Sequence, residues 1–368
     1  MKLLIDLSYI ENLHNGVALY AFRILKGMRD NGVKDICLFL NPKTAEIVQN
    51  EFPSYAYVIA PKIEANLINK VWYRRLVTSY NYSKIINKMD CEIVFTPFSD
   101  PFYFWKIRKK HVRTIHDLQE LRVYSRFWIF CGKIFVPIKI KNSDALITIS
   151  DFVKQDVLKK YKFAAKKNIK KIYAPIDVNR QDTLPLLDFR YILCVNTLAE
   201  YKNVMTLLKA FEEIKDSIPH KLVLVGGVTS YLSDVIKPYI TDHNLENRVV
   251  HFNKVTDNEL KSLYQHTSLF VTPSLQEGFG ATPIEAALCN TPVISSKETA
   301  LYESTMGLLN YYEPAMDHQA LATKIMEVLQ NPPSQEELEK ISSSFKEQYN
   351  NRKIAKEVYE FITSVYEG

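Results

Sequence analysis

"LFVTPSLQEGFGATPIEA", residues 269–286, changes its pattern twice within a short stretch. The apolar run at residues 269–273 predicts a buried strand, and the glycines after it predict a loop at the carboxyl end of that strand. Pro283 suits the first turn of a following helix, because its missing N–H would have no intrahelical partner there. The stretch therefore predicts a strand–loop–helix unit of the kind that builds parallel α/β sheets.

The same alternation runs through most of the chain. Helical patterns separate the strand candidates, for example at residues 17–30, and the chain reads as helical beyond Gln319. Residues 174–190 contain two prolines and no clear period, so we expect a boundary there and domains at 1–182 and 183–368. Strands are expected at residues 3–6, 37–40, 56–60, 92–96, 112–116, 145–150, 191–196, 221–226, 248–252, 269–273 and 292–295.

Length and composition indicate a globular protein of two domains. The 368 residues are 47% hydrophobic and 24% charged, an ordinary composition for a soluble protein. A chain of this length is too long for a single hydrophobic core, so two domains are expected. The five cysteines are far apart and form no CxxC pair, which argues against a disulfide framework and a zinc site. Without a signal peptide or a long apolar run, the expected location is the cytoplasm, with peripheral attachment to the cytoplasmic face of a membrane.

Charge is unevenly distributed along the chain. The net charge is +6, but residues 1–180 hold 31 Lys and Arg against 16 Asp and Glu, whereas the remainder holds 16 against 25. Halves of opposite sign favour two domains with different partners. The basic half indicates a positive face for an anionic partner, either nucleic acid or an acidic membrane surface.

The loop and helix of residues 274–286 combine two kinds of polar group. Gly278 and Gly280 allow the backbone to approach a ligand closely, and a helix N-terminus beside free amides suits an anion. Glu277 in the loop and Glu285, which we expect in the first turn of the helix, suit hydroxyl groups. Amides for phosphate and carboxylates for sugar hydroxyls together indicate a sugar nucleotide. In the purely structural alternative, Glu285 only caps the helix and the glycines only form a tight turn.

The stretch Pro273–Ala286 resembles the Glu-x7-Glu signature of the retaining family-4 glycosyltransferases. Residues 191–211 resemble the start of the second domain of that family, and residues 1–22, 114–118 and 144–161 resemble parts of its first domain. The resemblance implies an α/β protein of GT-B fold, in which two Rossmann-like doubly wound domains face each other across an interdomain cleft. The last helix would pack back on the first domain.

The resemblance also implies roles for individual residues in the second domain. Glu277 would contact hydroxyls of the transferred sugar, Glu285 would contact the nucleotide ribose, and Lys202 would hold the diphosphate. Two departures leave fewer cations than usual around that diphosphate, because Asn196-Thr197 stands where many members of that family carry a glycine and a basic residue, and Tyr201 stands where arginine is frequent. Thr197 would offer only a hydroxyl. The backbone amides facing the donor would be those of Gly278, Phe279 and Gly280.

In the first domain, His116 lies at the predicted carboxyl end of a strand. The matching histidine of the family lies against the donor sugar near its reacting carbon, so His116 and Glu277 are the predicted catalytic pair. Asp117 would orient His116. Asn15-Gly16 resembles the glycine loop of the family, and Gly16 would let the backbone approach the diphosphate.

The expected reaction follows from the resemblance. A hexose-type sugar would pass from a nucleotide-diphosphate sugar to a saccharide or lipid-linked saccharide with retention, as in cell-surface polysaccharide or lipopolysaccharide synthesis. No Asp-x-Asp motif occurs, so we expect no metal and no cofactor beyond the donor. No G-x-G-x-x-G follows a strand, which weakens a nicotinamide interpretation. An epimerase of nucleotide sugars on the same fold and a catalytically silent binding partner are the alternatives.

The surface that binds the acceptor is predicted to lie in residues 66–141, which hold 15 Lys and Arg against 5 Asp and Glu, mixed with aromatics. Such a surface suits anionic lipid headgroups, although basic and aromatic side chains also suit stacking on nucleic-acid bases. We expect an anionic membrane surface and a lipid-linked acceptor rather than nucleic acid. The lysine-rich stretch at residues 159–171 is interpreted as a solvated face.

Overall fold

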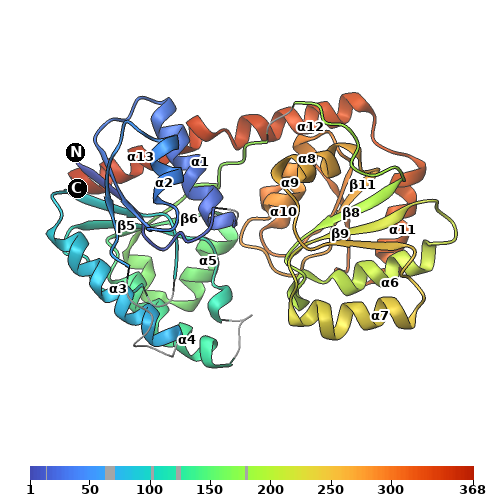
Figure 1. Ribbon diagram of the computed structural model, residues 1–368, viewed down its shortest axis with the longest axis horizontal. Coiled ribbons are helices and arrows are strands. Elements are labelled where there is room, and N and C mark those ends of the chain that lie inside the picture. The colour runs from blue at the N-terminus through green and yellow to red at the C-terminus, as the bar shows by residue number, and fades with distance from the viewer. Residues whose placement is uncertain (14, 63–70, 101–102, 122–125, 179–180) are drawn as a thin grey trace. The chain divides into compact units, whose positions relative to one another are not determined.

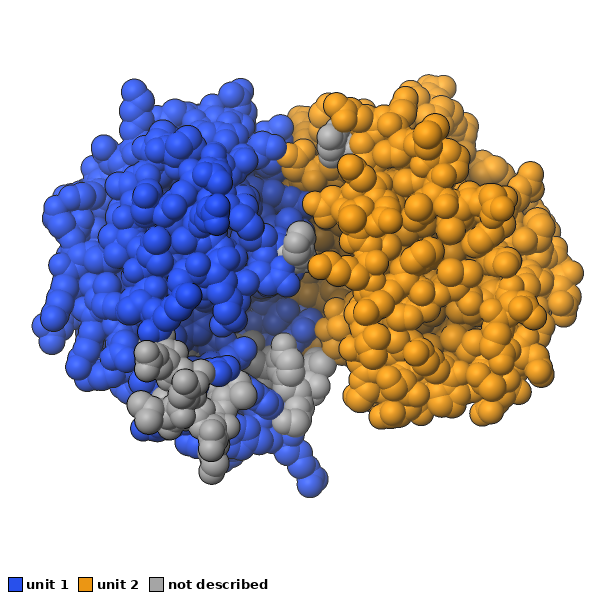
Figure 2. Space-filling model, viewed as in Figure 1, with its two compact units in different colours: residues 1–175, 349–368 blue, residues 176–348 orange. Residues whose placement is uncertain are grey.

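The chain divides into two compact units in a computed structural model (Figure 1). Unit 1 comprises Met1–Pro175 and Tyr349–Gly368, and unit 2 comprises Ile176–Gln348 (Figure 2). Each unit is therefore described by itself. The residues that the structure describes are 1–13, 15–62, 71–100, 103–121, 126–178 and 181–368.

The described part of unit 1 forms a seven-stranded parallel sheet in the order β3-β2-β1-β4-β5-β6-β7. The strand order reverses direction between β1 and β4, which is the topological switch point of a doubly wound sheet. β1 is buried along its whole length, as expected for a central strand covered by helices on both faces. The strands are β1 Leu3–Leu7, β2 Ile36–Leu40, β3 Ala56–Ile59, β4 Ile93–Thr96, β5 Lys110–Ile115, β6 Ala145–Thr148 and β7 Asn168–Lys171.

Helices of unit 1 come from both ends of the chain, and α13 packs directly on α1. The two helices approach so closely at Gly27 that a Cβ there would lie 2.3 Å from the Asn351 carbonyl oxygen and 2.5 Å from the Ala355 Cβ. Glycine is needed at this crossing for its small size. The helices of the unit are α1 Gly16–Asp30, α2 Ala45–Glu51, α3 Val71–Lys88, α4 Arg126–Lys141, α5 Asp151–Lys160 and α13 Asn351–Glu367, with short 3-10 turns at Gln119–Leu121 and Lys162–Lys166.

Unit 2 repeats the plan with a six-stranded parallel sheet in the order β10-β9-β8-β11-β12-β13. Its switch point lies between β8 and β11, which pair through Leu269–Ile192 and Phe270–Leu193. Ligands of such sheets bind beyond the carboxyl ends of the strands at this point. The strands are β8 Tyr191–Val195, β9 Lys221–Val225, β10 Val249–Phe252, β11 Leu269–Thr272, β12 Val293–Ser296 and β13 Asn310–Tyr312.

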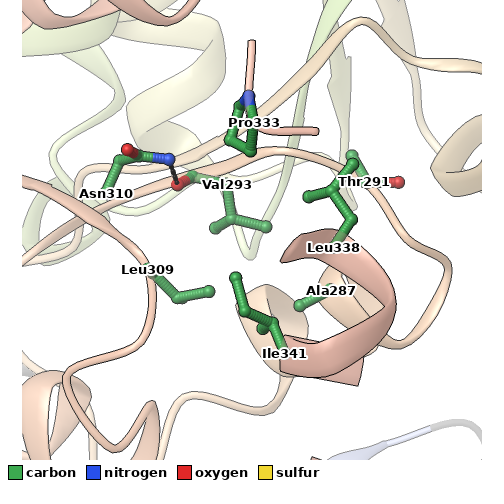
Figure 3. Close-up of a pocket in the computed structure, with 8 residues that line it drawn as sticks. All are labelled: Ala287, Thr291, Val293, Leu309, Asn310, Pro333, Leu338 and Ile341. Atoms are coloured by element: carbon green, nitrogen blue, oxygen red, sulfur yellow. Dashed lines mark hydrogen bonds between the residues drawn. The ribbon is translucent and has the colours of Figure 1, made fainter. Parts of the chain in front are cut away.

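Apolar side chains of α6 and α11 form a core against one face of this sheet, and α9 packs against α12. Between α9, α12 and the strands lies a cavity of about 10 Å³ lined mainly by Ala287, Val293 and Leu338 (Figure 3). Such a space is a packing gap and is too small for a substrate. The helices are α6 Val204–Ile214, α7 Lys237–Asp242, α8 Asp257–His266, α9 Ala281–Leu288, α10 Leu301–Ser304, α11 His318–Gln330 and α12 Gln335–Gln348, with a 3-10 turn at Glu200–Lys202 and a π-helical turn at Leu232–Ile236.

All eleven predicted strands are present, with ends shifted by one or two residues. Two observed strands were not predicted. β7 lies within the stretch interpreted as a solvated face, and as an edge strand it keeps Asn168 exposed and its other residues half-buried, with lysines that discourage further pairing. β13 spans only three residues, too few for a pattern. In the described part of the chain, no helix has both the length and the apolar character needed to cross a membrane.

Candidate functional site

Two loops of unit 2 leave neighbouring strand ends at the switch point. The loop after β8 carries Thr197 and Lys202, and the loop after β11 carries Glu277 and the glycines that follow it. The backbone joins the two loops, since the Leu275 N–H donates to the Tyr201 carbonyl at 2.9 Å. Parallel strands bring their carboxyl ends to one edge, so residues distant in sequence meet here.

Lys202 and Glu277 form a buried ion pair. The Lys202 Nζ lies 2.6 Å from the Glu277 Oε1, and each residue is only 9% exposed. The Tyr201 ring centroid lies 5.1 Å from the same ammonium, so an aromatic face supports the cation at a position that is often arginine in the family it resembles. The structure therefore joins the residue predicted for the diphosphate to the residue predicted for the sugar hydroxyls.

Thr299 fixes the backbone of Glu277 from a third loop, the one that follows β12. The Glu277 N–H donates to the Thr299 Oγ1 at 2.9 Å. Thr299 has a φ of 54°, a left-handed conformation that β-branched residues rarely adopt. Strain of this kind persists where the surrounding structure enforces it, often at functional sites. Sequence reasoning missed Thr299, because nothing in "SKETAL" marks a left-handed threonine.

Asn203, also missed, holds the loop after β8 in place. It is 4% exposed with a φ of 56°, and its Nδ2 donates to the carbonyls of Pro273 and Ala315 at 3.1 and 2.8 Å. The Thr206 hydroxyl donates to the Asn203 Oδ1 at 2.8 Å. One buried amide thus ties the start of α6 to the loop after β11. The tolerance of asparagine for left-handed backbone was the available signal.

The glycine loop leads into α9. Gly278, Phe279 and Gly280 are all buried. Gly280 caps α9 with a φ of 86°, and a Cβ there would lie 2.5 Å from the Leu301 Cδ2. The requirement for glycine at this position therefore arises from the backbone conformation and from packing against α10.

Glu285 is the fifth residue of α9, so the expectation that it lies in the first turn is wrong. The helix begins at Ala281, directly after Gly280, and this early start places Glu285 in its second turn. The Tyr264 hydroxyl donates to the Glu285 Oε2 over a long 3.4 Å, and the side chain is half-buried. Thr197, by contrast, is exposed at the start of the loop after β8.

His116 belongs to unit 1 and follows β5. Its Nε2 lies 2.8 Å from the Pro97 carbonyl oxygen, which can only accept, so Nε2 carries the proton and Nδ1 is an acceptor. The Tyr20 ring packs edge-on against the imidazole at 4.8 Å. Burial lowers the pKa of His116 from 6.5 to about 4, against the opposing effect of the Pro97 carbonyl. A neutral imidazole can accept a hydrogen bond from a hydroxyl near pH 7.

The other predicted residues of unit 1 occupy helix ends. The Asp117 Oδ1 accepts from the Gln119 N–H at 3.0 Å. Gly16 is the first residue of α1 and is exposed, and a Cβ there would meet nothing within 4 Å. The Asn15 side chain caps α1 by accepting from the Ala18 N–H at 2.8 Å. His14, part of the matching stretch, lies outside the described residues.

Metal-ligating side chains are not clustered in the part of the chain that the structure describes: no group of three His, Cys, Asp or Glu residues there is close enough to hold an ion. Among the predicted residues of unit 2, Lys202 offers a cation and the loop amides offer N–H donors to an anion. Glu277 and Glu285 offer carboxylate acceptors to hydroxyls.

Comparison with known proteins covers nearly the whole chain. Residues 14–180 match the family described as Glycosyltransferase Family 4, and residues 175–345 match Glycosyl transferases group 1. Over 328 residues the chain is 26% identical to the O-antigen chain mannosyltransferase RfbU of Salmonella typhimurium, covering 85% of this chain and 87% of the relative. Over 114 residues it is 32% identical to the lipopolysaccharide core biosynthesis mannosyltransferase LpcC of Rhizobium leguminosarum bv. viciae, covering 30% and 32%.

Solved structures share the fold. Sucrose-phosphate synthase of Thermosynechococcus elongatus superposes with a TM-score of 0.79 at 18% identity, with all of both chains covered. HepE of Anabaena, in complex with UDP and glucose, superposes with a TM-score of 0.73 at 17% identity, covering 99% of this chain and 100% of that one. At these identities the likeness extends to the fold alone.

Proposed function

The chain belongs to the family-4 glycosyltransferases, and from this premise we propose that the Lys202–Glu277 pair is the centre of its nucleotide-sugar site. The GT-B fold and retaining glycosyl transfer in cell-surface polysaccharide synthesis, both predicted from the sequence, are confirmed. The donor is a nucleotide sugar and the acceptor a saccharide. The proposal concerns which residues perform the transfer.

The observation that carries the proposal is the 2.6 Å contact between the Lys202 Nζ and the Glu277 Oε1 at the switch point of unit 2. An ammonium has three protons, so Lys202 can donate to a diphosphate oxygen while it keeps Glu277. The start of α6 directly after Asn203 adds the positive end of a helix dipole. Both would stabilise the negative charge that builds on the departing diphosphate.

Glu277 would orient the sugar. Its carboxylate has a second oxygen, and two hydroxyls of a hexose can share the acceptor sites that Lys202 leaves. A carboxylate that already accepts a hydrogen bond from an ammonium suits the role of acceptor better than that of proton donor. Glu285 would contact the ribose, with the backbone amides of Gly278, Phe279 and Gly280 facing the donor.

The reaction conserves configuration at the anomeric carbon. The bond from that carbon to the diphosphate oxygen breaks, the acceptor hydroxyl oxygen attacks from the same face, and its proton passes to the departing phosphate. The products are the glycoside and the nucleoside diphosphate. In unit 1, His116 would accept a hydrogen bond from a sugar hydroxyl through Nδ1, and Gly16 would present backbone to the diphosphate. No metal is required by this scheme.

We propose that the transferred sugar is a hexose, and that mannose is the first candidate, because the relatives RfbU and LpcC are named mannosyltransferases. Their names also support an acceptor in O-antigen or lipopolysaccharide synthesis, so we propose a lipid-linked saccharide presented at an anionic membrane surface on the cytoplasmic side. Thr197 would add a hydroxyl to the donor site.

The test is donor turnover with a panel of nucleotide sugars, including GDP-mannose and UDP-glucose. Release of nucleoside diphosphate with a new glycoside supports the proposal, and isomerised donor would indicate an epimerase. Glu277→Ala and Lys202→Met should remove turnover. The control is Lys324→Met, whose Nζ makes a 2.6 Å pair with Glu327 on α11 and which should leave turnover intact. Turnover that survives Glu277→Ala would show that the site lies elsewhere.

A further inference from the structure

Two neighbouring helices of unit 1 contain no acidic residue. α3 and α4 together carry eight Lys and Arg side chains and no Asp or Glu. Their outer side chains include large apolar groups as well as cations. We call this set the α3–α4 surface; its exposed members in the described part of the two helices include Tyr73, Arg74, Arg75, Tyr80, Lys84, Lys88, Arg126, Phe127, Phe130, Lys133, Ile134, Ile138 and Lys141.

The apolar residues of α4 form a stripe along one side of the helix. Phe127, Phe130, Ile134 and Ile138 follow each other at spacings of three and four, so they share one face. They are 47%, 60%, 41% and 36% exposed, whereas Val136, on the opposite side of the same helix, is buried. A continuous apolar stripe that stays exposed on a folded chain marks a docking surface.

Aromatic contacts join the two helices into one surface. The Trp72 ring of α3 lies 6.1 Å from the Phe127 ring of α4, and the Arg75 guanidinium lies 5.4 Å above the Trp128 ring. Both contacts lie near the starts of the two helices. On α3, the Lys84 Nζ lies 4.3 Å from the Tyr80 ring centroid.

We propose that the α3–α4 surface docks on an anionic lipid bilayer, with the apolar stripe in the headgroup–acyl boundary and the cations among lipid phosphates. The inference rests on the proposed function, because docking would bring the enzyme to a lipid-linked acceptor. Surface-lying amphipathic helices bind membranes through this combination of aromatic or aliphatic wedges and flanking Lys and Arg. The complete lack of carboxylates on both helices supplies the charge complementarity.

Two other occupants fit the surface less well. Nucleic acid would use aromatic rings for stacking on bases, but Ile134 and Ile138 offer no ring and are among the exposed members. A second copy of the chain would bring two surfaces without acidic residues together, which like-charge repulsion disfavours. A bilayer uses both the aliphatic and the cationic members.

The experiment is vesicle flotation with the full chain. Vesicles of phosphatidylcholine, with and without phosphatidylglycerol, are compared at low and high salt. We expect binding only with the anionic lipid and weaker binding at high salt. The variant Phe130→Ser/Ile134→Ser should bind roughly tenfold more weakly, since two exposed apolar groups no longer leave water. Its control, Val228→Ser/Met316→Ser, removes equally exposed apolar groups from unit 2 and should bind as the wild type.

The charge contribution is tested by a second pair of variants. Arg74→Gln/Lys133→Gln should weaken binding about fivefold per side chain, which corresponds to roughly 1 kcal/mol for each cation near an anionic surface. Lys34→Gln/Lys159→Gln makes the same change in net charge at exposed positions elsewhere in unit 1 and should have little effect. Circular dichroism and the melting temperature confirm that all four variants are folded.

Other outcomes overturn the inference. It fails if anionic vesicles do not bind the wild type, or if the two surface variants bind them as well as their controls. It also fails if the surface variants lose binding to single-stranded RNA rather than to vesicles, or if they convert a dimer to a monomer in sedimentation. Donor-induced stabilisation, measured on the same variants, should be unchanged, so a failed donor site and a failed docking surface are distinguished.

Discussion

Lys202 and Glu277 allow the structural and the functional roles of one ion pair to be separated. Lys202→Met leaves a carboxylate whose side chain is 12% exposed without its cation, and Glu277→Gln leaves an ammonium that is 11% exposed without its anion. Each single change should destabilise the protein by roughly 2–3 kcal/mol, near the lower limit for breaking a buried pair because about a tenth of each side chain still meets water.

The double variant Lys202→Met/Glu277→Gln contains no orphaned charge, so it should lose only roughly 1–2 kcal/mol. The coupling energy of the cycle is then about 3 kcal/mol. Chemical denaturation supplies the free energies, and the melting temperature of each single variant should fall by roughly 4–12 °C. Lys324 and Glu327 provide the matched pair, since their 2.6 Å contact is exposed and should couple by less than about 1 kcal/mol.

Donor binding should not recover with stability. The double variant regains most of its melting temperature but has neither the ammonium for a diphosphate nor the carboxylate for sugar hydroxyls. Saturating donor should therefore raise the melting temperature of the wild type and leave that of the double variant unchanged. A coupling energy as small as that of the surface pair would refute the buried contact, and recovered donor binding would refute its role in the site.

Three further predictions concern neighbouring features. Thr299→Ala should weaken donor binding in calorimetric titration and lower stability by roughly 1–3 kcal/mol, because the part-buried Glu277 N–H loses its acceptor, whereas Thr299→Ser should retain both. Gly280→Ala should lower stability by roughly 1–3 kcal/mol in thermal melts, since its φ of 86° and the nearby Leu301 oppose a side chain. The lowered pKa means that His116 binds a proton more readily in the unfolded chain than in the folded one. Its contribution to the free energy of unfolding is therefore fully present above pH 6.5 and is lost as the pH falls towards 4. The wild type should therefore lose roughly 1–2 kcal/mol more than His116→Asn between pH 7 and pH 5, measured by denaturant titration; equal losses would contradict the lowered pKa of His116.

Alternation of apolar runs was sufficient to predict both parallel sheets, because buried strands in such sheets are short and continuously apolar. β7 escaped prediction because its lysines suit the edge of a sheet, where one side faces water. The register of α9 was missed for a local reason. Gly280 in a left-handed conformation caps the helix so that it begins already at Ala281, and no pattern in the sequence fixes that conformation.

The sequence predicted Lys202 and Glu277 separately, each as a residue of a loop after a strand. Their contact joins positions 75 residues apart and depends on the strand order, which periodicity does not give. Thr299 and Asn203 were missed because their importance comes from backbone conformation and from hydrogen bonds to distant carbonyls. Residues that contact a ligand directly can be predicted from their chemistry and position in a motif. Residues that position other residues can be identified only once the fold is known.

The packing of α13 on α1 has a consequence for biosynthesis. α13 is translated after all of unit 2, yet it completes unit 1 through the crossing at Gly27 and through the Tyr366 hydroxyl, which donates to Glu92 at 2.6 Å. At 5–20 residues per second, unit 1 must wait roughly 10–35 s on the ribosome with the groove on α1 uncovered. During that interval the nascent chain exposes apolar surface that chaperones can bind, while unit 2 has every segment it needs to fold.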